Sequence, residues 1–242
     1  MMNILFSRTT VRPLASAITT LILLSAMPFC HASGVRPETA TVIIDEAERG
    51  GSINVTNTES LPVLLQTRIR DLPDDKGPTL IVTQPVTRLE PGQTQRVRFV
   101  MNSDTPLKVE HIKRVSFEGV AEKRGNSSQV RLGVRQDLPV IIVPAGQKRV
   151  RSDLWTDLKW SVAGDHLRVR NGGKSVIRLS PGVKVGSIPV TLKKSYILPG
   201  ETLNAALPPG KRLAPNVKVS FSPVTRYGFS VGKQTAPLDV NV

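Results

Sequence analysis

The chain has 242 residues and is strongly basic, with 33 lysines and arginines against 19 acidic residues and a formal net charge of +14 at pH 7. Aromatic residues make up only 4% of it, so few side chains can stack on nucleic-acid bases. The histidines and the single cysteine lack the spacing of metal ligands or of a nucleophile and its base. We therefore expect a non-enzyme, with no catalytic site, no metal, no cofactor and no nucleic-acid partner.

The first 32 residues have the pattern of a secretory signal peptide. Arg8 and Arg12 precede an apolar run at residues 14–27 that is too short to span a bilayer, and a small residue stands at the expected cleavage point, Ala32. Cleavage there removes Cys30, the only cysteine in the sequence, so the exported protein would have no disulfide. We expect a soluble exported protein that does not insert into a membrane.

The rest of the chain predicts an all-β fold, because short alternating apolar runs recur between turn signals and no sustained helical period is present. In the first half we expect strands at residues 41–44, 52–55, 63–69, 80–82, 97–101, 112–117 and 129–144, with a loop at 118–128. This number and spacing of strands is typical of an immunoglobulin-like β-sandwich.

A second β unit is expected after a break at Pro144 to Gln147, where turn residues are followed by a basic run. Its predicted strands lie at residues 154–162, 167–169, 176–179, 183–190, 202–207, 217–221 and 227–231. The sequence thus predicts an N-terminal immunoglobulin-like domain at residues 33–147 and a C-terminal β-sandwich domain at 148–242.

The stretch at residues 129–144 has two different sides. Val130, Leu132 and Val134 alternate with polar or small residues, so an extended chain places three aliphatic side chains on one face. An exposed apolar strand promotes aggregation unless a partner covers it. The stretch therefore indicates either a partner-binding strand or an ordinary half-buried strand of the sandwich.

Several of these segments together resemble one protein family. They are Gly34 and Val35 with residues 41–44, residues 52–57, residues 84–92 leading into 95–99, and the stretch 129–144. In these segments the sequence resembles the periplasmic chaperones of the chaperone–usher pathway that assemble bacterial pili. Residues 167–171 and 227–228 resemble the family's second domain more weakly, so the resemblance extends over essentially the whole expected mature chain. The short loop expected at 118–128 is similar to the short-loop branch of that family.

The resemblance implies a fold of two immunoglobulin-like β-sandwich domains in a boomerang arrangement. It also implies donor-strand complementation, in which the chaperone inserts a strand into the groove of an incomplete pilus subunit. Val130, Leu132 and Val134 fall where the family places the inserted side chains. The implied partners are pilus subunits and an outer-membrane usher, and the exposed strand also allows self-association when no client is bound.

The sequence departs from the family where the client is usually anchored. Family members bind the subunit's terminal carboxylate through an arginine and a lysine, but Thr41 and Pro139 occupy those two positions here. Neither residue carries a positive charge. Arg135, Arg131 and Arg36 are the candidate replacements, with Arg135 preferred because it lies on the expected donor strand.

Two other functions fit an exported all-β chain. A secreted immunoglobulin-like pilus subunit or adhesion module should lack its own last strand and carry an alternating N-terminal arm, which residues 34–40 do not provide. A carbohydrate-binding module would need several exposed aromatic residues, which are scarce here. The chaperone is therefore the preferred interpretation.

Overall fold

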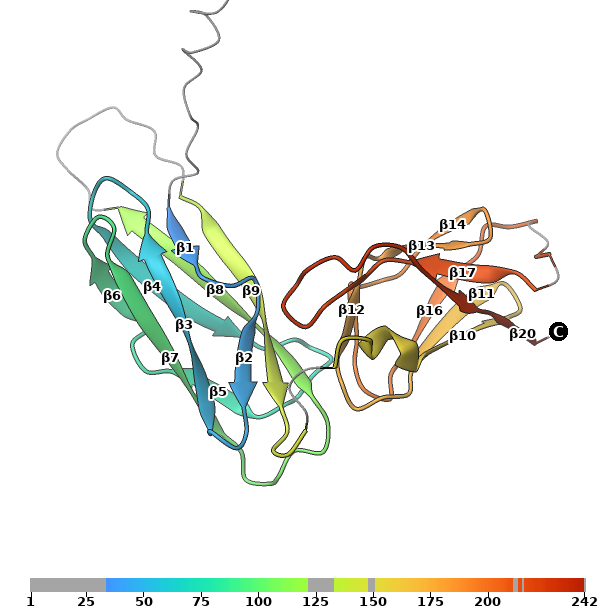
Figure 1. The fold of residues 1–242 in the computed structure, drawn as a ribbon, viewed down its shortest axis with the longest axis horizontal. Coiled ribbons are helices and arrows are strands. Elements are labelled where there is room, and N and C mark those ends of the chain that lie inside the picture. The colour runs from blue at the N-terminus through green and yellow to red at the C-terminus, as the bar shows by residue number, and fades with distance from the viewer. Residues whose placement is uncertain (1–33, 122–132, 148–150, 211–212, 215, 242) are drawn as a thin grey trace, which may run out of the picture. The chain divides into compact units, whose positions relative to one another are not determined.

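The computed structural model describes residues 34–121, 133–147, 151–210, 213, 214 and 216–241 (Figure 1). Nearly all of its regular structure is β, and the one helix in these ranges is the short 3₁₀ helix η1 (Leu154–Asp157). No helix among the described residues is both long enough and apolar enough to cross a membrane. The predicted all-β fold class is therefore confirmed.

The strands of the first half form one continuous sheet, in the order β5-β7-β3-β2-β9-β8-β4-β6, with β1 paired to β3. They are β1 (Val35–Pro37), β2 (Val42–Asp45), β3 (Gly50–Asn57), β4 (Val63–Arg70), β5 (Thr79–Val82), β6 (Val86–Leu89), β7 (Thr94–Asn102), β8 (His111–Ala121) and β9 (Arg135–Val143).

This sheet folds into two layers because the N-terminal segment changes partners. Strand β1 pairs antiparallel with β3, whereas β2 pairs parallel with β9. Strands β2 and β3 share a single residue pair, Asp45 with Gly50, at the hairpin that joins them. The first sandwich therefore has β5, β7, β3 and β1 in one layer and β2, β9, β8, β4 and β6 in the other.

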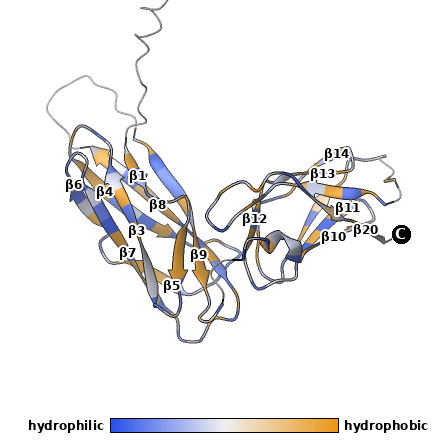
Figure 2. Ribbon diagram, in the orientation of Figure 1, coloured by the Kyte–Doolittle hydropathy of each residue, from blue (hydrophilic) through white to orange (hydrophobic). Residues whose placement is uncertain are grey.

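The core of the first sandwich follows from the alternation of apolar residues. On β7, Val97, Phe99 and Met101 are buried while the residues between them are exposed, as the period of two predicts. Val115 and Phe117 of β8 enter the same core. Figure 2 shows this alternation as hydrophobic and hydrophilic colours that change along single strands.

The predicted strands of the first half are all present, apart from the beginning of the last one. Residues 122–132 lie outside the described residues, so residues 129–132 stay a prediction. Gly133 and Val134, which we also expected in this strand, directly precede β9 and are not part of it. Residues 118–121, which we expected in a loop, continue β8. Strands β1 and β6 were missed, since each is short and β1 contains a proline while β6 directly follows one.

The strands of the second half form three small sheets around one core. Their orders are β16-β11-β10-β20, β15-β12-β18 and β14-β13-β17-β19. The strands are β10 (Leu158–Ala163), β11 (His166–Asn171), β12 (Ile177–Leu179), β13 (Gly182–Val185), β14 (Ile188–Thr191), β15 (Tyr196–Ile197), β16 (Thr202–Ala206), β17 (Lys218–Phe221), β18 (Pro223–Val224), β19 (Gln234–Pro237) and β20 (Asp239–Asn241). Trp160 and Phe221 pack with ring centroids 5.1 Å apart in this second core.

Three predictions for the second half were wrong. Residues 154–157 form η1 rather than the start of a strand. The single strand expected at 183–190 is a hairpin, β13 and β14, that turns at Gly186 with a φ of 60°. Residues 227–231 form no strand beyond one isolated bridge at Ser230, because the chain turns between Thr225 and Phe229.

The two sandwiches belong to one compact unit, Gly34–Val242, and meet through a small apolar cluster. Ile112, Ile141 and Val143 of the first sandwich pack there with Val176 of the second. These side chains lie on the opposite face of β8 and β9 from Val115 and Ile142, which fill the first core. The domain boundary near residue 147 stays a prediction, since residues 148–150 are outside the described ranges.

Candidate partner-binding site

Strand β9 has an open edge over its first half. It pairs antiparallel with β8 from Arg135 to Ile142, but its parallel pairing with β2 begins only at Val140. From Arg135 to Pro139, β8 is therefore the only strand in the described part of the chain that pairs with β9. Unpaired backbone groups along a strand edge are a template for an added strand.

Of the three predicted donor residues, only Val134 lies in the described structure. It directly precedes β9 and is 42% exposed, which is high for a valine. A Cβ atom placed on Gly34 would lie 3.6 Å from the Cβ atom of Val134, so this residue lies beside the start of β1. Val130 and Leu132 lie outside the described residues, and their role stays a prediction.

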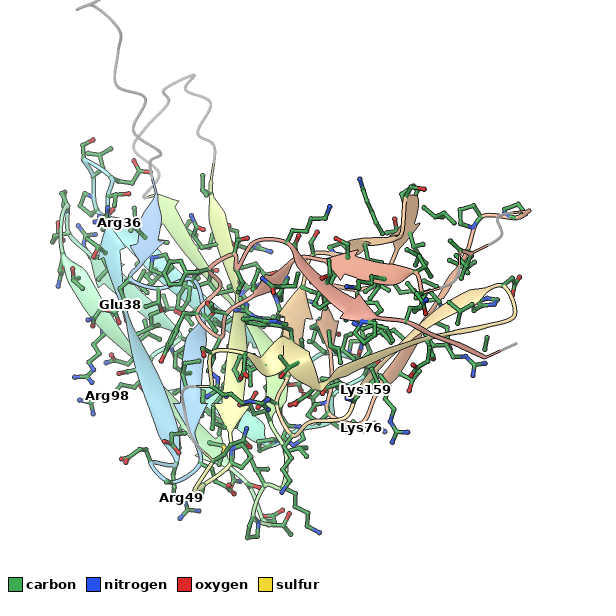
Figure 3. All side chains as sticks on the ribbon, turned by 45° about the vertical axis from the view of Figure 1, so that its right-hand side comes forward. Arg36, Glu38, Arg49, Lys76, Arg98 and Lys159 are labelled. Carbon is green, nitrogen blue, oxygen red and sulfur yellow. The ribbon has the colours of Figure 1, made fainter. Side chains whose placement is uncertain are left out.

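The arginines proposed from the sequence do not gather at one place in the described structure. Arg135 donates from Nε and Nη2 to one Glu118 carboxylate oxygen, at 2.9 and 2.7 Å, and is well exposed. Arg36 is exposed on β1, which pairs with β3 rather than with β9 (Figure 3). Arg131 is outside the described residues.

Thr41 and Pro139, the neutral residues at the family's anchor positions, lie next to each other. Val42 and Val140 are partners in the parallel β2–β9 ladder, and Thr41 and Pro139 directly precede them. Thr41 and Pro139 are both buried. Arg135 lies four residues before Pro139, which is about 13 Å along an extended strand. The structure therefore places the preferred replacement well away from this position.

Two arginines that sequence reasoning missed do lie at this place. Arg178 of β12 donates from Nη2 to the Thr41 hydroxyl oxygen at 3.0 Å. Arg114 of β8 stands opposite Pro139 in the β8–β9 ladder. The alternation of Arg178 with buried Ile177 and Leu179 could have shown that it leaves the second core, but no local pattern reveals its contact with Thr41.

A buried ion pair also joins the two sandwiches. Glu110, just before β8, pairs with Arg226 from the turn after β18, and their side chains are 1% and 4% exposed. Glu110 also accepts hydrogen bonds from the Val176 backbone N–H at 2.9 Å and from Gln147 Nε2 at 3.1 Å. Burial raises the pKa of the Glu110 carboxyl, although the charge of Arg226 opposes that shift.

A second polar cluster links the sandwiches nearer to solvent. Asp74 accepts a hydrogen bond from the Tyr196 hydroxyl at 2.7 Å and pairs with Lys194, which also pairs with Glu201 at 2.7 Å. Burial and the Asp74 carboxylate raise the pKa of Tyr196. With the Glu110 pair and the apolar cluster, these contacts tie the second sandwich to the start of β8, the end of β9 and the segment between β4 and β5.

The described residues include no group of three or more histidine, cysteine or acidic side chains that could hold a metal ion. His111 instead contacts the buried carboxylate of Asp75, with 2.6 Å between Nδ1 and Oδ1. His166 contacts its neighbour Asp165. Both histidines therefore have local acidic partners.

Comparison with known proteins shows what kind of protein this arrangement belongs to. The family model described as pili and flagellar-assembly chaperone, PapD N-terminal domain, matches residues 34–148. Fimbrial chaperone YhcA of Escherichia coli strain K12 is 40% identical over 214 residues, which cover 86% of this chain and 92% of that protein. The chain belongs to the fimbrial chaperone family.

Solved chaperones share the fold. DraB of Escherichia coli is 25% identical, with a TM-score of 0.67 over 84% of this chain and 96% of that one. The SafB chaperone, solved in complex with the SafA pilin of Salmonella enterica, has a TM-score of 0.69 at 23% identity and covers 86% and 98% of the two chains. This fimbrial chaperone thus has the two-domain immunoglobulin-like fold of its relatives, and its family is not an enzyme family.

Proposed function

We propose that this protein is a periplasmic chaperone that stabilises pilus subunits by donor-strand complementation and delivers them to an outer-membrane usher. The observation that carries the proposal is the open edge of β9 between Arg135 and Pro139, which directly follows Val134 in the chain. Val130 and Leu132, the other two proposed donor residues, precede it in the sequence. A subunit strand added along this edge gains backbone hydrogen bonds, while alternate aliphatic side chains fill its groove.

The first sandwich is complete, which supports a chaperone rather than a pilus subunit. Strand β9 already pairs with both β2 and β8 over Val140 to Ile142, and its side chains Val140 and Ile142 are buried in the core. The chain therefore does not need a strand from a partner to fill this core. The exposed edge of β9 is therefore free to pair with a strand of a subunit, or with a second copy of the chain when no client is bound.

Export is part of the proposal. The protein reaches the periplasm through the signal peptide at residues 1–32, and cleavage after Ala32 leaves a mature protein without cysteine. The mass of intact protein purified from the periplasm should correspond to a start at Ser33 or Gly34. A retained N-terminus or a lipid adduct contradicts this part of the proposal.

Co-expression with a pilus subunit tests the chaperone function. Changing Val130, Leu132 and Val134 together to threonine should abolish recovery of the subunit, because each buried aliphatic side chain contributes about 1.5–3 kcal/mol. A matched control changes Ile81 and Val100 to threonine, since they are 52% and 46% exposed and pair on β5 and β7.

Recovery of the subunit should be unchanged in the control. Circular dichroism should show that both variants fold. If the triple variant recovers as much subunit as the native protein, strand donation by these residues is wrong.

A further inference from the structure

Nearly all of the net positive charge of the expected mature chain lies in its second half. Residues 34–147 carry 15 lysines and arginines against 14 acidic residues, whereas residues 148–242 carry 16 against 5. The sandwich that holds the open edge of β9 is therefore close to neutral. Such an asymmetry of charge between two domains points to an anionic partner of the basic one.

Three of these charges gather on the outer face of β10 and β11. Lys159, Arg168 and Arg170 alternate with buried residues, so their side chains point away from the second core, and all three are exposed. Lys159 stands directly opposite Arg170 in the ladder, and Arg168 opposite Ser161. Together with Thr202 of β16 they line one open groove. We call Lys159, Arg168 and Arg170 the basic face.

The basic face is not neutralised by the rest of the described chain. The side chains of Lys159, Arg168 and Arg170 form no ion pair or hydrogen bond with any residue that the structure describes. The acidic residue in their groove, Asp239, stands opposite Ser161 at the β20 edge. Like charges directly opposite each other destabilise a sheet, so the pair of Lys159 and Arg170 is unfavourable until an anion covers it.

The other side chains of this face favour a lipid surface over a protein. Apart from two alanines, the outward residues of β10, β11 and β16 are polar or charged. The large apolar side chains that are exposed in the described second sandwich, Tyr227 and Phe229, lie in the turn after β18. The centre of a protein–protein interface is usually poor in charge and rich in aromatic residues. Attraction to an anionic bilayer needs only basic side chains close to its surface.

We propose that the basic face binds the phosphate headgroups of an anionic phospholipid bilayer, so that the second sandwich attaches the chaperone to a membrane surface. The attachment is peripheral, since this face offers no apolar side chain larger than alanine for insertion. It goes beyond strand donation, because β9 belongs to the other sandwich and the two sites share no residue.

The test measures co-sedimentation with vesicles, using protein purified from the periplasm and checked by mass for loss of residues 1–32. The native chaperone should bind vesicles of phosphatidylcholine and phosphatidylglycerol in equal parts, and not vesicles of phosphatidylcholine alone. Changing Lys159, Arg168 and Arg170 together to glutamine should weaken binding by about 100-fold, since each basic side chain near an anionic surface contributes about fivefold. Raising sodium chloride from about 0.1 M to 0.5 M should abolish binding by the native chaperone.

Two further variants separate the basic face from net charge and from misfolding. The matched control changes Lys184, Lys218 and Lys233 to glutamine, which removes the same charge from exposed positions on or beside the other sheet, and should bind within about twofold of the native chaperone. Arg168→Lys with Arg170→Lys keeps the charge and should also bind normally, because lipid attraction does not need the guanidinium fork. Equal losses in the control and in the basic-face variant would show that the inference is wrong.

Soluble polyglutamate distinguishes a membrane from an acidic protein as the partner. If the native chaperone binds polyglutamate but not the anionic vesicles, or if the two lysine substitutions weaken binding as much as the three glutamines, the basic face recognises carboxylates on a protein and the inference is wrong. Vesicle binding requires no pilus subunit, so its failure leaves the proposed function standing. Loss of subunit recovery, conversely, does not affect the result with vesicles.

Discussion

Arg226 of the second sandwich forms an ion pair with Glu110 of the first, and both side chains are almost completely buried. The same carboxylate accepts the backbone N–H of Val176, so it also fixes the start of β12. Removing one member of such a pair leaves an uncompensated charge in the interior. Single substitutions that break a buried pair are therefore costly, even where the intact pair adds little net free energy to folding.

The first prediction concerns this pair. Arg226→Ala should lower the free energy of unfolding by about 3–5 kcal/mol, because Glu110 remains buried without its partner. Urea unfolding followed by tryptophan fluorescence measures the loss. Replacing both residues, with Glu110→Gln and Arg226→Met, should recover part of it. An effect no larger than that of the exposed Arg168→Ala would show that the pair is not buried in solution.

The second prediction concerns the pH dependence of stability. Asp75 is buried, and although burial acts to raise its pKa, hydrogen bonds from His111 and from the Ile112 and Gly77 backbone lower the pKa below its usual 3.8. A carboxyl with a lowered folded-state pKa contributes stability that is present above the unfolded-state pKa. That stability is lost as the pH falls through the folded-state pKa.

Asp75→Asn should therefore destabilise the protein at pH 5–7, and its difference from the native protein should shrink below about pH 3.8. Urea unfolding of both proteins from pH 7 to pH 2.5 provides the measurement. The exposed Asp104→Asn is the matched control and should show no such trend. A difference that stays constant to pH 2.5 would contradict the proposed role of the Asp75 carboxylate.

The sequence predicted best those strands whose side chains alternate between a core and solvent. Val97, Phe99 and Met101 are an example, since period-two burial determines both the strand and its inward face. Residues 154–157 were predicted wrongly because their apolar side chains fit a strand or a turn of helix equally well. In the structure Leu154 is buried from η1.

The candidate site was less predictable than the fold. The open edge of β9 depends on where β2 begins to pair with it, and the transfer of the N-terminal segment from β3 to β9 has no sequence signature. Arg178 and Thr41 are 137 residues apart in the chain and meet only because the sandwiches pack together. Counting along the sequence instead favoured Arg135. It is only four residues from Pro139 in the chain, but an extended strand places it about 13 Å away.

The third prediction tests the core under β9. Ile142 is fully buried and pairs with both Ile44 and His111 across the two ladders. Ile142→Ala should reduce the free energy of unfolding by about 2–5 kcal/mol, because it removes buried methyl groups and leaves a cavity. Ile81→Ala, at a site that is 52% exposed, should change it by less than about 0.5 kcal/mol.

Equilibrium unfolding in urea compares these two variants under the same conditions. If Ile142→Ala costs no more than Ile81→Ala, strand β9 does not fill the first core, and the sandwich would need a strand from elsewhere. That result would also weaken the distinction between a chaperone and a pilus subunit.

The last prediction compares the two polar links between the sandwiches. Asp74 is partly exposed and Lys194 has a second partner in Glu201, so Asp74→Asn leaves no buried charge without a counter-ion. The substitution should cost about 1 kcal/mol or less in unfolding free energy, and salt should screen much of that contribution. Glu110→Gln, in contrast, should have an effect that hardly changes with salt, because water and ions do not reach the pair with Arg226. Urea unfolding of both variants in about 0.05 M and 0.5 M sodium chloride separates the two behaviours. Equal salt dependence for the two substitutions would mean that the Glu110 pair is open to solvent, and that the contact between the sandwiches is looser than the buried pair requires.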